Sequence, residues 1–423
     1  MSGYTIENGE YHVDGVALKD IAAQYGTPTY VYSAHVIKSQ YESLANEMAK
    51  ALPADKKAKL CYACKANSNI GILSYIRSLG SSLEIVSEGE LKRGLKAGFD
   101  ASQIVSTGVG KSDSEIISCL NAGIHQFNVE SLPELENINR IAGEIGKTAT
   151  VVFRLNPNVS GGGHHKISTG RTRDKFGLSE ESIYSAYETA SQMDHVQAVG
   201  LSVHIGSQVF TVKVFETAFG KMPDIVKNLR GRGHEVSRLD IGGGFPIIYK
   251  DENLLDLKNY AEWVRDIIHP LDTEIILEPG RYLVGNAGVL LSEAVYIKET
   301  STRDFLVIDA AMNDLIRPTL YDAYHGIQAV ANLDRPMHTY DVVGPICETG
   351  DTFTQDREVN EMQRGDLVMI QSAGAYGFCM ASNYNTRNLP TEVLVHDGKV
   401  HEINKRQVFE DVIARETIPD FLK

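Results

Sequence analysis

The chain has 423 residues, of which 43% are hydrophobic and 23% charged, so it is an ordinary globular chain long enough for two large cores. Its formal net charge of −14, without a conspicuous basic cluster, disfavours nucleic acids and anionic membranes as partners. The N-terminus does not read as a secretory signal, and no apolar stretch approaches the ~20 residues that span a bilayer. We therefore expect a cytoplasmic protein.

Eight short β-like runs follow one another in the first two thirds of the chain, with helix-like stretches between them. They cover residues 59–64, 82–86, 103–106, 125–129, 150–155, 199–205, 238–241 and 273–278. Strand–helix alternation repeated eight times predicts a closed parallel (β/α)8 barrel, a TIM-like α/β fold. Such barrels build their active site at the C-terminal ends of the strands. The residues expected at those ends are Lys65, Ser87, His204, Gly242, Gly243, Gly244 and Glu278.

A second, mostly β domain is predicted after the eighth strand. From about residue 286 the helical period fades, and strand-like segments appear at 289–297, 304–310, 366–372 and 391–403. The last segment contains Asp397-Gly398, a two-residue hairpin signal. The first residues carry a hairpin of their own and are expected to pack on this β-sandwich or barrel-like domain. The predicted domains are therefore 37–285 for the barrel, and 1–36 with 286–423 for the β domain.

The residues at the predicted barrel mouth suit one kind of ligand. Lys65 directly follows a strand, and partial burial there would lower its pKa enough to trap a carbonyl. The glycines 242–244 would let backbone N–H groups converge on a phosphate. His204 could be a general base or a flat plate against an aromatic ring, and Glu278 could pair with a protonated pyridine nitrogen. A lysine, a ring, a glycine turn and a carboxylate are the parts that hold pyridoxal phosphate.

Each of these residues also has an ordinary structural interpretation. Lys65 alone would be an exposed lysine at a strand end, and His204 a core histidine with satisfied nitrogens. Glu278 could form an internal salt bridge with Arg281, and glycine turns are common.

The β domain contributes three further segments. Arg317 and Tyr321 lie four residues apart, and an arginine fork with a phenol suits a substrate carboxylate. Cys347 beside Glu348 places a proton donor next to an acceptor for an ammonium group, and Tyr376 is a phenol in a glycine-rich loop. Each segment alone could be structural.

Three other patterns are set aside. Gly110-Lys111-Ser112 resembles the end of a P-loop, but Val105 stands where its first glycine belongs. His164-His165 has no partner at metal-ligand spacing, so we expect no metal site. Cys61 and Cys64 spell C-x-x-C on a strand, where they would face opposite sides; we interpret the motif as coincidence, with a redox pair as the alternative.

Taken together and in order, the motifs resemble the group III pyridoxal phosphate-dependent decarboxylases with an alanine racemase-like barrel. The motifs are YACKAN, HIGSQ, DIGGGF, EPGRY, NDLIRPTLY, GPICETGD and AGAYGF, and they cover nearly the whole chain. The stretch at 164–177, H-x-x-I-x-T-G-x-x-x-x-K-F-G, is similar to the diaminopimelate decarboxylase family within that group. Cys64 and Glu84 depart mildly from the usual valine and aspartate, and the second puts a local hydrogen bond near the cofactor in doubt.

The resemblance implies a role for each matching residue. Lys65 would form the Schiff base with pyridoxal 5'-phosphate, His204 would stack on its ring, Glu278 would pair with the ring nitrogen, and Cys347 would donate a proton. The implied cofactor contacts are Lys65, His204, Ser207, Gly242, Gly243, Gly244, Glu278, Gly280, Arg281 and Tyr376. The implied substrate contacts are Arg281, Arg317, Tyr321, Glu348 and Tyr376.

The implied reaction is decarboxylation of meso-2,6-diaminopimelate to L-lysine and carbon dioxide, the last step of lysine biosynthesis. The enzyme would be a homodimer with active sites at its interface, where the β domain supplies substrate and dimer contacts, and Cys347 and Glu348 come from the partner chain. The alternatives are a decarboxylase of ornithine, lysine, arginine or carboxynorspermidine, an amino-acid racemase, and a non-catalytic protein that binds pyridoxal phosphate and regulates its free level.

Overall fold

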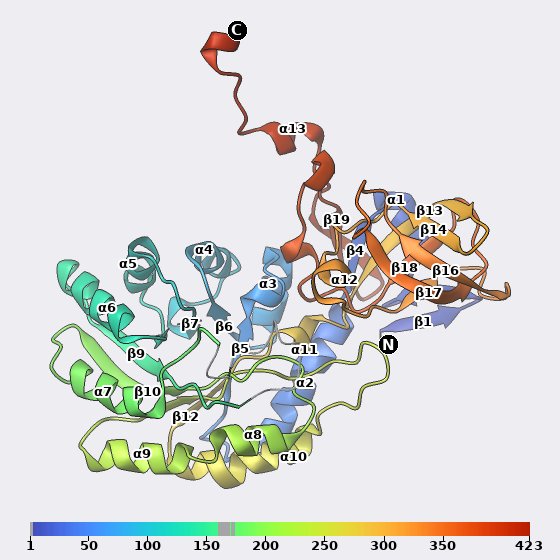
Figure 1. Ribbon diagram of the computed structural model, residues 1–423. Coiled ribbons are helices and arrows are strands. Elements are labelled where there is room, and N and C mark those ends of the chain that lie inside the picture. The colour runs from blue at the N-terminus through green and yellow to red at the C-terminus, as the bar shows by residue number, and fades with distance from the viewer. Residues whose placement is uncertain (1–2, 160–169, 171–173) are drawn as a thin grey trace. The chain divides into compact units, whose positions relative to one another are not determined.

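A computed structural model describes residues 3–159, 170 and 174–423 (Figure 1). The chain forms two compact units, and each is described here by itself. The barrel unit comprises residues Lys38–Ile248 and Glu252–Leu283, and the β unit comprises Met1–Ile37, Tyr249–Asp251 and Val284–Lys423. The exact domain limits given in the sequence analysis remain predictions. The short segment Tyr249–Asp251, which lies within the predicted barrel, groups with the β unit.

The barrel unit confirms the predicted fold class. Its eight strands pair in parallel and close in the order β10-β11-β12-β5-β6-β7-β8-β9. The strands are β5 (Lys59–Ala63), β6 (Ser82–Ile85), β7 (Ile104–Ser106), β8 (Gln126–Val129), β9 (Ala149–Arg154), β10 (Val196–Ser202), β11 (Arg238–Asp240) and β12 (Glu274–Leu277). Strands β6, β7 and β8 are buried along their whole length, as expected for strands covered on both faces.

Helices lie on the outside of the barrel (Figure 1). They are α2 (Ala34–Ala51), α3 (Ile70–Ser78), α4 (Glu88–Lys96), α5 (Asp113–Ala122), α6 (Leu132–Glu144), α7 (Glu180–Ala190), α8 (Val212–Phe219), α9 (Met222–Gly231), α10 (Leu257–Trp263) and α11 (Arg281–Val284). Helix α2 precedes the first barrel strand, and the others follow barrel strands. Short polar side chains begin several of them by accepting backbone N–H groups of the first turn. Ser87 does so for α4, and Ser112 forms a capping box with Glu115 at α5.

The β unit is built on a nine-stranded sheet and a small three-stranded sheet. The small sheet contains β1 (Tyr4–Glu7), β2 (Glu10–Val13) and β3 (Val16–Ala17). The large sheet contains β4 (Thr29–Ser33), β13 (Gly288–Glu299), β14 (Asp304–Ile308), β15 (Ile327–Ala329), β16 (Met337–Val343), β17 (Thr352–Asn360), β18 (Leu367–Ile370), β19 (Thr391–His396) and β20 (Lys399–Asn404). Asp397 and Gly398 form the predicted turn between β19 and β20, both at positive φ.

One apolar core joins the start of the chain to the large sheet of the β unit. Tyr4, Val13 and Leu18 pack with Val31 and Val289 in this core. Helix α1 (Leu18–Tyr25) belongs to it through its buried face, whereas α12 (Arg317–Tyr321) and α13 (Phe409–Ile413) are short helices later in the chain. The N-terminal segment therefore packs on the β unit, as the sequence predicted.

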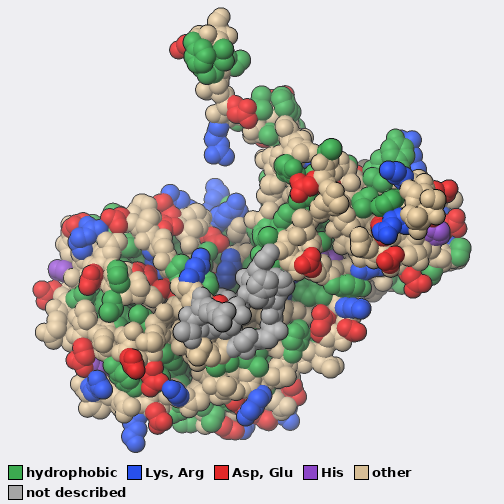
Figure 2. All heavy atoms as spheres, in the orientation of Figure 1, with side chains coloured by type: hydrophobic (Ala, Val, Ile, Leu, Met, Phe, Trp, Pro, Cys, Tyr) green, Lys and Arg blue, Asp and Glu red, His purple; other side chains and the backbone are tan. Residues whose placement is uncertain are grey.

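The end of the chain carries exposed apolar side chains. The segment after β20 contains α13 and ends near Phe421 and Leu422, which are 84% and 66% exposed. Figure 2 shows these hydrophobic side chains gathered at the C-terminal end. Among the described residues, no helix is both long and apolar enough to cross a bilayer.

Candidate active site

Lys65 lies at the C-terminal end of the first barrel strand, as predicted. Strand β5 ends at Ala63, and a short turn over Cys64–Ala66 carries the lysine. Its Nζ atom lies 3.1 and 3.0 Å from the two carboxylate oxygens of Glu84 on β6. The Glu84 side chain is fully buried, whereas that of Lys65 is 34% exposed, so the amine can be reached from solvent. The glutamate that departs from the family pattern is therefore an ion-pair partner of the candidate lysine.

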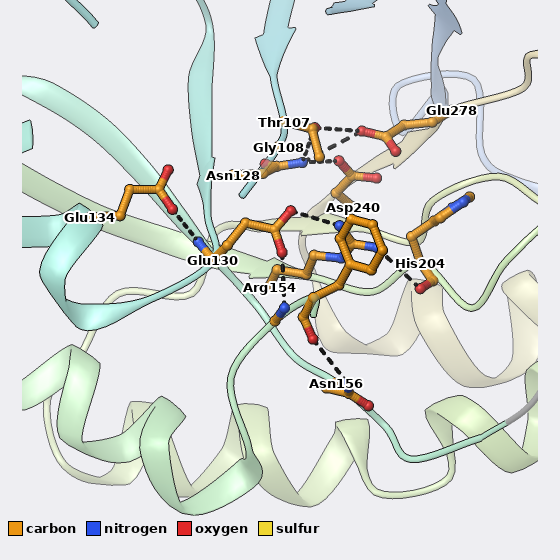
Figure 3. Close-up of polar contacts among 12 residues, drawn as sticks. Thr107, Gly108, Asn128, Glu130, Glu134, Arg154, Asn156, His204, Asp240 and Glu278 are labelled. Carbon is orange, nitrogen blue, oxygen red and sulfur yellow. Dashed lines mark hydrogen bonds and ion pairs between the residues drawn. The ribbon is translucent and has the colours of Figure 1, made fainter. Parts of the chain in front are cut away.

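Glu278 belongs to a buried cluster of carboxylates with Asp240 and Glu84, and Figure 3 shows Glu278 and Asp240. It follows β12 directly, and its Oε1 atom accepts from Thr107 Oγ1 at 3.4 Å and from Asn128 Nδ2 at 3.5 Å. The same amide donates to Asp240 at 2.9 Å. Burial, and then the charges of Asp240 and Glu84, raise the pKa of Glu278 well above its usual range. The cluster therefore favours a protonated Glu278 until a cationic group binds beside it.

His204 is held as a neutral ring. It lies two residues beyond β10, and its Nδ1 atom accepts the N–H of Gly243 at 3.1 Å. Burial, and then the charges of Arg154 and Lys65, lower the pKa of His204 well below its usual range. Arg154 donates to the His204 carbonyl at 3.4 Å and pairs with Glu130 at 2.7 Å (Figure 3). An uncharged imidazole suits a plate for an aromatic ligand better than it suits an acid.

Packing within the protein leaves little or no room for side chains at the glycines 242–244. A Cβ atom on Gly242 would lie 2.5 Å from the Val203 carbonyl, and one on Gly243 would lie 2.2 Å from that of Glu278. Gly242 and Gly244 also have positive φ angles. The N–H groups of Gly242 and Gly243 already donate to Asp240 and His204. Of the three, only the N–H of Gly244 is without an acceptor among the described residues.

The remaining candidates in the barrel unit lie beside these groups. Arg281 begins α11, is nearly buried, and donates from Nε to Ser207 Oγ at 3.0 Å. The sequence left open a salt bridge between Glu278 and Arg281. Among the described contacts, Glu278 instead accepts from Thr107 and Asn128, and Arg281 donates to Ser207. A Cβ atom on Gly280 would lie 3.0 Å from that of Ala63, so this glycine lets the chain pass close to the turn that carries Lys65.

The candidates in the β unit differ in burial: Arg317 is buried, Tyr321 and Tyr376 are half-buried, and Cys347 and Glu348 are exposed. Arg317 begins α12 and is 6% exposed, and Tyr321 ends the same helix. Cys347 and Glu348 are both exposed, and Glu348 accepts a hydrogen bond from Tyr384 at 2.8 Å. Tyr376 has a φ of 56°, a conformation that non-glycine residues seldom adopt.

Two of the three patterns set aside in the sequence analysis lie among the described residues. Lys111 is buried and binds the carbonyls of Gly108 and Asn128 and the carboxylate of Glu134. Cys61 and Cys64 are buried free thiols. His164, His165 and most of the 164–177 stretch lie outside the described residues.

Comparison with known proteins relates nearly the whole chain to one family. Residues 38–285 match the family model described as pyridoxal-dependent decarboxylase, pyridoxal binding domain. A diaminopimelate decarboxylase of Pseudomonas aeruginosa is 43% identical over 418 residues, which is 99% of each chain. The crystal structure of diaminopimelate decarboxylase from M. jannaschii with L-lysine is 37% identical, has a TM-score of 0.93, and matches 100% of this chain and 99% of that one.

The chain belongs to the diaminopimelate decarboxylase family. Another structure of this family, from Helicobacter pylori with L-lysine, is 37% identical, with a TM-score of 0.89 over 94% of this chain and 98% of that one. The predicted family is thereby confirmed. A lysine/ornithine decarboxylase of Vibrio vulnificus, at 23% identity and a TM-score of 0.78 over 90% of this chain and 97% of that one, shares the fold.

The residues of the barrel unit fit the cofactor of this family. Glu278 is a buried carboxylate whose pKa is raised in a cluster of acids, and such a group would be stabilised by a protonated ring nitrogen. Lys65 presents a partly exposed amine, and His204 presents a neutral ring. Gly244 offers a backbone N–H for a phosphate oxygen. These features match an aromatic cation with a phosphate tail.

Several residues that shape this site escaped the sequence interpretation. Asn128, Arg154 and Asp240 each end, or come next to the end of, a barrel strand, and each is buried. A polar residue near the C-terminal end of an otherwise apolar barrel strand is the signal that could have found them. Their partners, however, come from other strands, and the pattern of one strand does not reveal them.

Glu90 is predicted to make the stability of the cofactor-free protein depend on pH. Burial, and then the nearby charge of Glu84, raise the pKa of Glu90 from 4.5 to about 7. The folded protein therefore keeps a proton that the unfolded chain loses. The resulting contribution of Glu90 to folding stability is complete below pH 4.5 and disappears as the pH rises through about 7. Between pH 5 and pH 8, this group should lower the free energy of unfolding of the wild type by at most about 3 kcal/mol. Glu90→Gln should abolish that decrease.

Urea unfolding of both proteins at pH 5 and pH 8 measures this difference. The Glu90 carboxylate accepts the N–H of Val86 at 2.7 Å, and a glutamine oxygen can keep that bond. An unchanged pH dependence in the variant would contradict the raised pKa.

Proposed function

We propose that this chain decarboxylates meso-2,6-diaminopimelate to L-lysine and carbon dioxide with pyridoxal 5'-phosphate, the last step of lysine biosynthesis. The observation that carries the proposal is the match over 99% of both chains to a diaminopimelate decarboxylase at 43% identity. Two solved relatives at 37% identity bind L-lysine, the expected product. The buried acids beside Lys65 give the proposal a chemical basis that is independent of those names.

The proposed cofactor site lies in the barrel unit. When bound, pyridoxal 5'-phosphate supplies a conjugated ring that takes up the electron pair left by the departing carbon dioxide. Lys65 provides the amine that attaches the cofactor, and Glu278 keeps the ring nitrogen protonated. His204 lies against the ring, and Tyr376 and Ser207 assist Gly244 at the phosphate, with Arg281 held in place by Ser207.

The proposed substrate contacts determine which carboxylate leaves. Arg317, Tyr321 and Arg281 bind the distal carboxylate, and Glu348 binds the distal ammonium group. With the distal end fixed, the reacting carboxylate would be the one beside Lys65, the residue that would hold the cofactor. The thiol of Cys347 then donates a proton to the carbon that has lost carbon dioxide. Each turnover therefore takes up one proton from solvent to restore the thiol.

A substrate panel tests the proposed function. The purified holoenzyme is incubated with meso-diaminopimelate, L-lysine, L-ornithine or L-arginine, and carbon dioxide and the product amine are measured. We expect carbon dioxide and L-lysine from meso-diaminopimelate alone, because a site that binds a second carboxylate rejects substrates that lack it. Faster release from ornithine, lysine or arginine would instead support the alternative decarboxylase.

We further propose a homodimer whose active sites contain Cys347 and Glu348 of the partner subunit. Both residues are exposed in the single chain, although the proposed roles need them beside a substrate. The C-terminal segment leaves large apolar side chains exposed, as surfaces that meet another protein often do. The expected cytoplasmic location also stays a prediction.

Mixed dimers test the shared site. Lys65→Ala and Cys347→Ala subunits should each be inactive alone, whereas unfolding and refolding them together should form mixed dimers with one intact site. Random assembly should then restore about a quarter of wild-type activity, because half of the dimers are mixed and each has one working site of two. No recovery in mixed dimers purified with two different affinity tags would indicate sites built within one chain.

A further inference from the structure

We propose that His325 is a positioning residue that fixes the Arg317 guanidinium for the distal carboxylate of the substrate. The inference rests on the proposed role of Arg317 and adds the residue that makes this arginine selective. Both side chains belong to the β unit, and they are 2% and 6% exposed.

The Nδ1 atom of His325 determines which tautomer the ring adopts. Nδ1 lies 2.7 Å from the backbone carbonyl oxygen of Gln371. A carbonyl oxygen only accepts, so Nδ1 carries the hydrogen and donates it. Gln371 follows β18 directly, and its own N–H donates to the Gly326 carbonyl at 2.8 Å. The imidazole is thereby anchored to backbone that is itself held in place.

The second ring nitrogen contacts the arginine. Nε2 of His325 lies 2.8 Å from Nη1 of Arg317. A guanidinium only donates, so Nε2 must present a lone pair. A protonated ring would place two N–H groups against each other at this distance. The two contacts together therefore require a neutral His325 with its hydrogen on Nδ1.

Tyr249 holds the same guanidinium from its face. The Cζ atom of Arg317 lies 4.9 Å from the centroid of the Tyr249 ring. That ring also meets the His325 ring nearly edge-on, with centroids 5.5 Å apart and an interplanar angle of 83°. The tyrosine therefore restrains the plane of the guanidinium, and the hydrogen bond to His325 restrains its rotation within that plane.

This restraint has a consequence for ligand choice. An arginine binds a carboxylate best when its planar fork is already oriented, because less conformational freedom is then lost on binding. Ligands with a distal carboxylate should gain from His325, and ligands without one should not. L-lysine and 1,5-diaminopentane form such a pair, since the second is the first without its carboxylate.

The test compares three variants of His325 in the holoenzyme. His325→Gln keeps an acceptor near the position of Nε2, His325→Asn keeps a donor near Nδ1 but loses that acceptor, and His325→Leu loses both. His338→Asn is the control, because His338 is a partly exposed histidine of the same unit that pairs with Asp304. Dissociation constants for L-lysine and 1,5-diaminopentane are measured by calorimetry and by the change in cofactor absorbance.

We expect His325→Asn and His325→Leu to weaken L-lysine binding by roughly tenfold or more, as for loss of a hydrogen bond to a charged group, with 1,5-diaminopentane unaffected. His325→Gln should stay closer to wild type, and His338→Asn should match it. In steady state, KM for diaminopimelate should rise more than kcat falls. In an Arg317→Ala background, removing His325 should have no further effect on L-lysine.

Two results would overturn the proposal in distinguishable ways. If wild type and Arg317→Ala bind L-lysine equally well, the proposed role of Arg317 fails, and the inference fails with it. If Arg317→Ala loses L-lysine but His325→Asn keeps it, only the inference fails. Nitrogen-15 NMR of histidine-labelled wild type is a check that needs no variant. A hydrogen on Nε2 of His325 would contradict the proposal even if every substitution disturbed folding.

Discussion

Lys65→Ala is expected to abolish the visible absorbance of the bound cofactor and to slow decarboxylation by about 10³-fold or more. The lysine supplies the proposed point of covalent attachment, and its amine is held at the barrel mouth by Glu84 at 3.0–3.1 Å. Removing it therefore removes the proposed attachment point. Absorbance spectra and carbon dioxide release, measured after equilibration with excess cofactor, give the two readouts.

Lys56→Ala is the matched control for this prediction. Lys56 is another lysine of the barrel unit, but it is exposed and pairs with Asp272 at 2.7 Å on the surface. We expect this variant to keep both the spectrum and the rate. A Lys65→Ala protein with an unchanged spectrum would mean that a different lysine holds the cofactor.

Glu278→Gln is expected to have the second largest effect, a fall in kcat of about 10²-fold or more with cofactor still bound. Burial, and then the charges of the neighbouring acids, already raise the pKa of Glu278, so the cofactor-free protein should tolerate a neutral amide of the same shape. With cofactor bound, the amide cannot supply the negative charge that keeps the ring nitrogen protonated. The ring then accepts electrons less well, and loss of carbon dioxide slows.

Thermal unfolding of the cofactor-free protein separates this effect from misfolding. Cofactor-free Glu278→Gln should unfold at or above the wild-type temperature, because the neutral amide removes a carboxyl group whose charged form is destabilised by burial and by Asp240 and Glu84. Glu274→Gln, at the opposite end of β12, should behave in the reverse way. Glu274 pairs with Lys59 at 2.7 Å, so its loss should lower stability with little effect on the rate. Full turnover by Glu278→Gln would contradict the assigned role.

The sequence predicted the barrel and the strand ends well because both depend on local patterns. The alternation of strands and helices along the chain indicates the fold class. Lys65 and Glu278 follow closely after largely buried strands. Strands β15, β16 and β17 were not singled out, because they are partly exposed and mix polar with apolar residues. Their pairing partners, rather than their own composition, make them strands.

The electrostatics of the site could not be derived from one strand at a time. Burial, and then the charge of Arg154 from β9, lower the pKa of His204. Burial, and then the charges of Asp240 from β11 and Glu84 from β6, raise the pKa of Glu278. The strand order of the closed barrel brings these groups together. Because they lie far apart along the chain, the sequence does not reveal that they are neighbours. The glycine run is a further example, because packing already excludes side chains at Gly242 and Gly243.

The most direct test of the account is to locate the covalent bond to the cofactor. The holoenzyme is reduced with sodium borohydride, which converts a lysine–cofactor linkage into a stable amine, and its peptides are analysed by mass spectrometry. We predict a single phosphopyridoxyl group, on the Lys65 side chain. The same modification on any other lysine, or none on a fully active enzyme, would contradict the proposed active site.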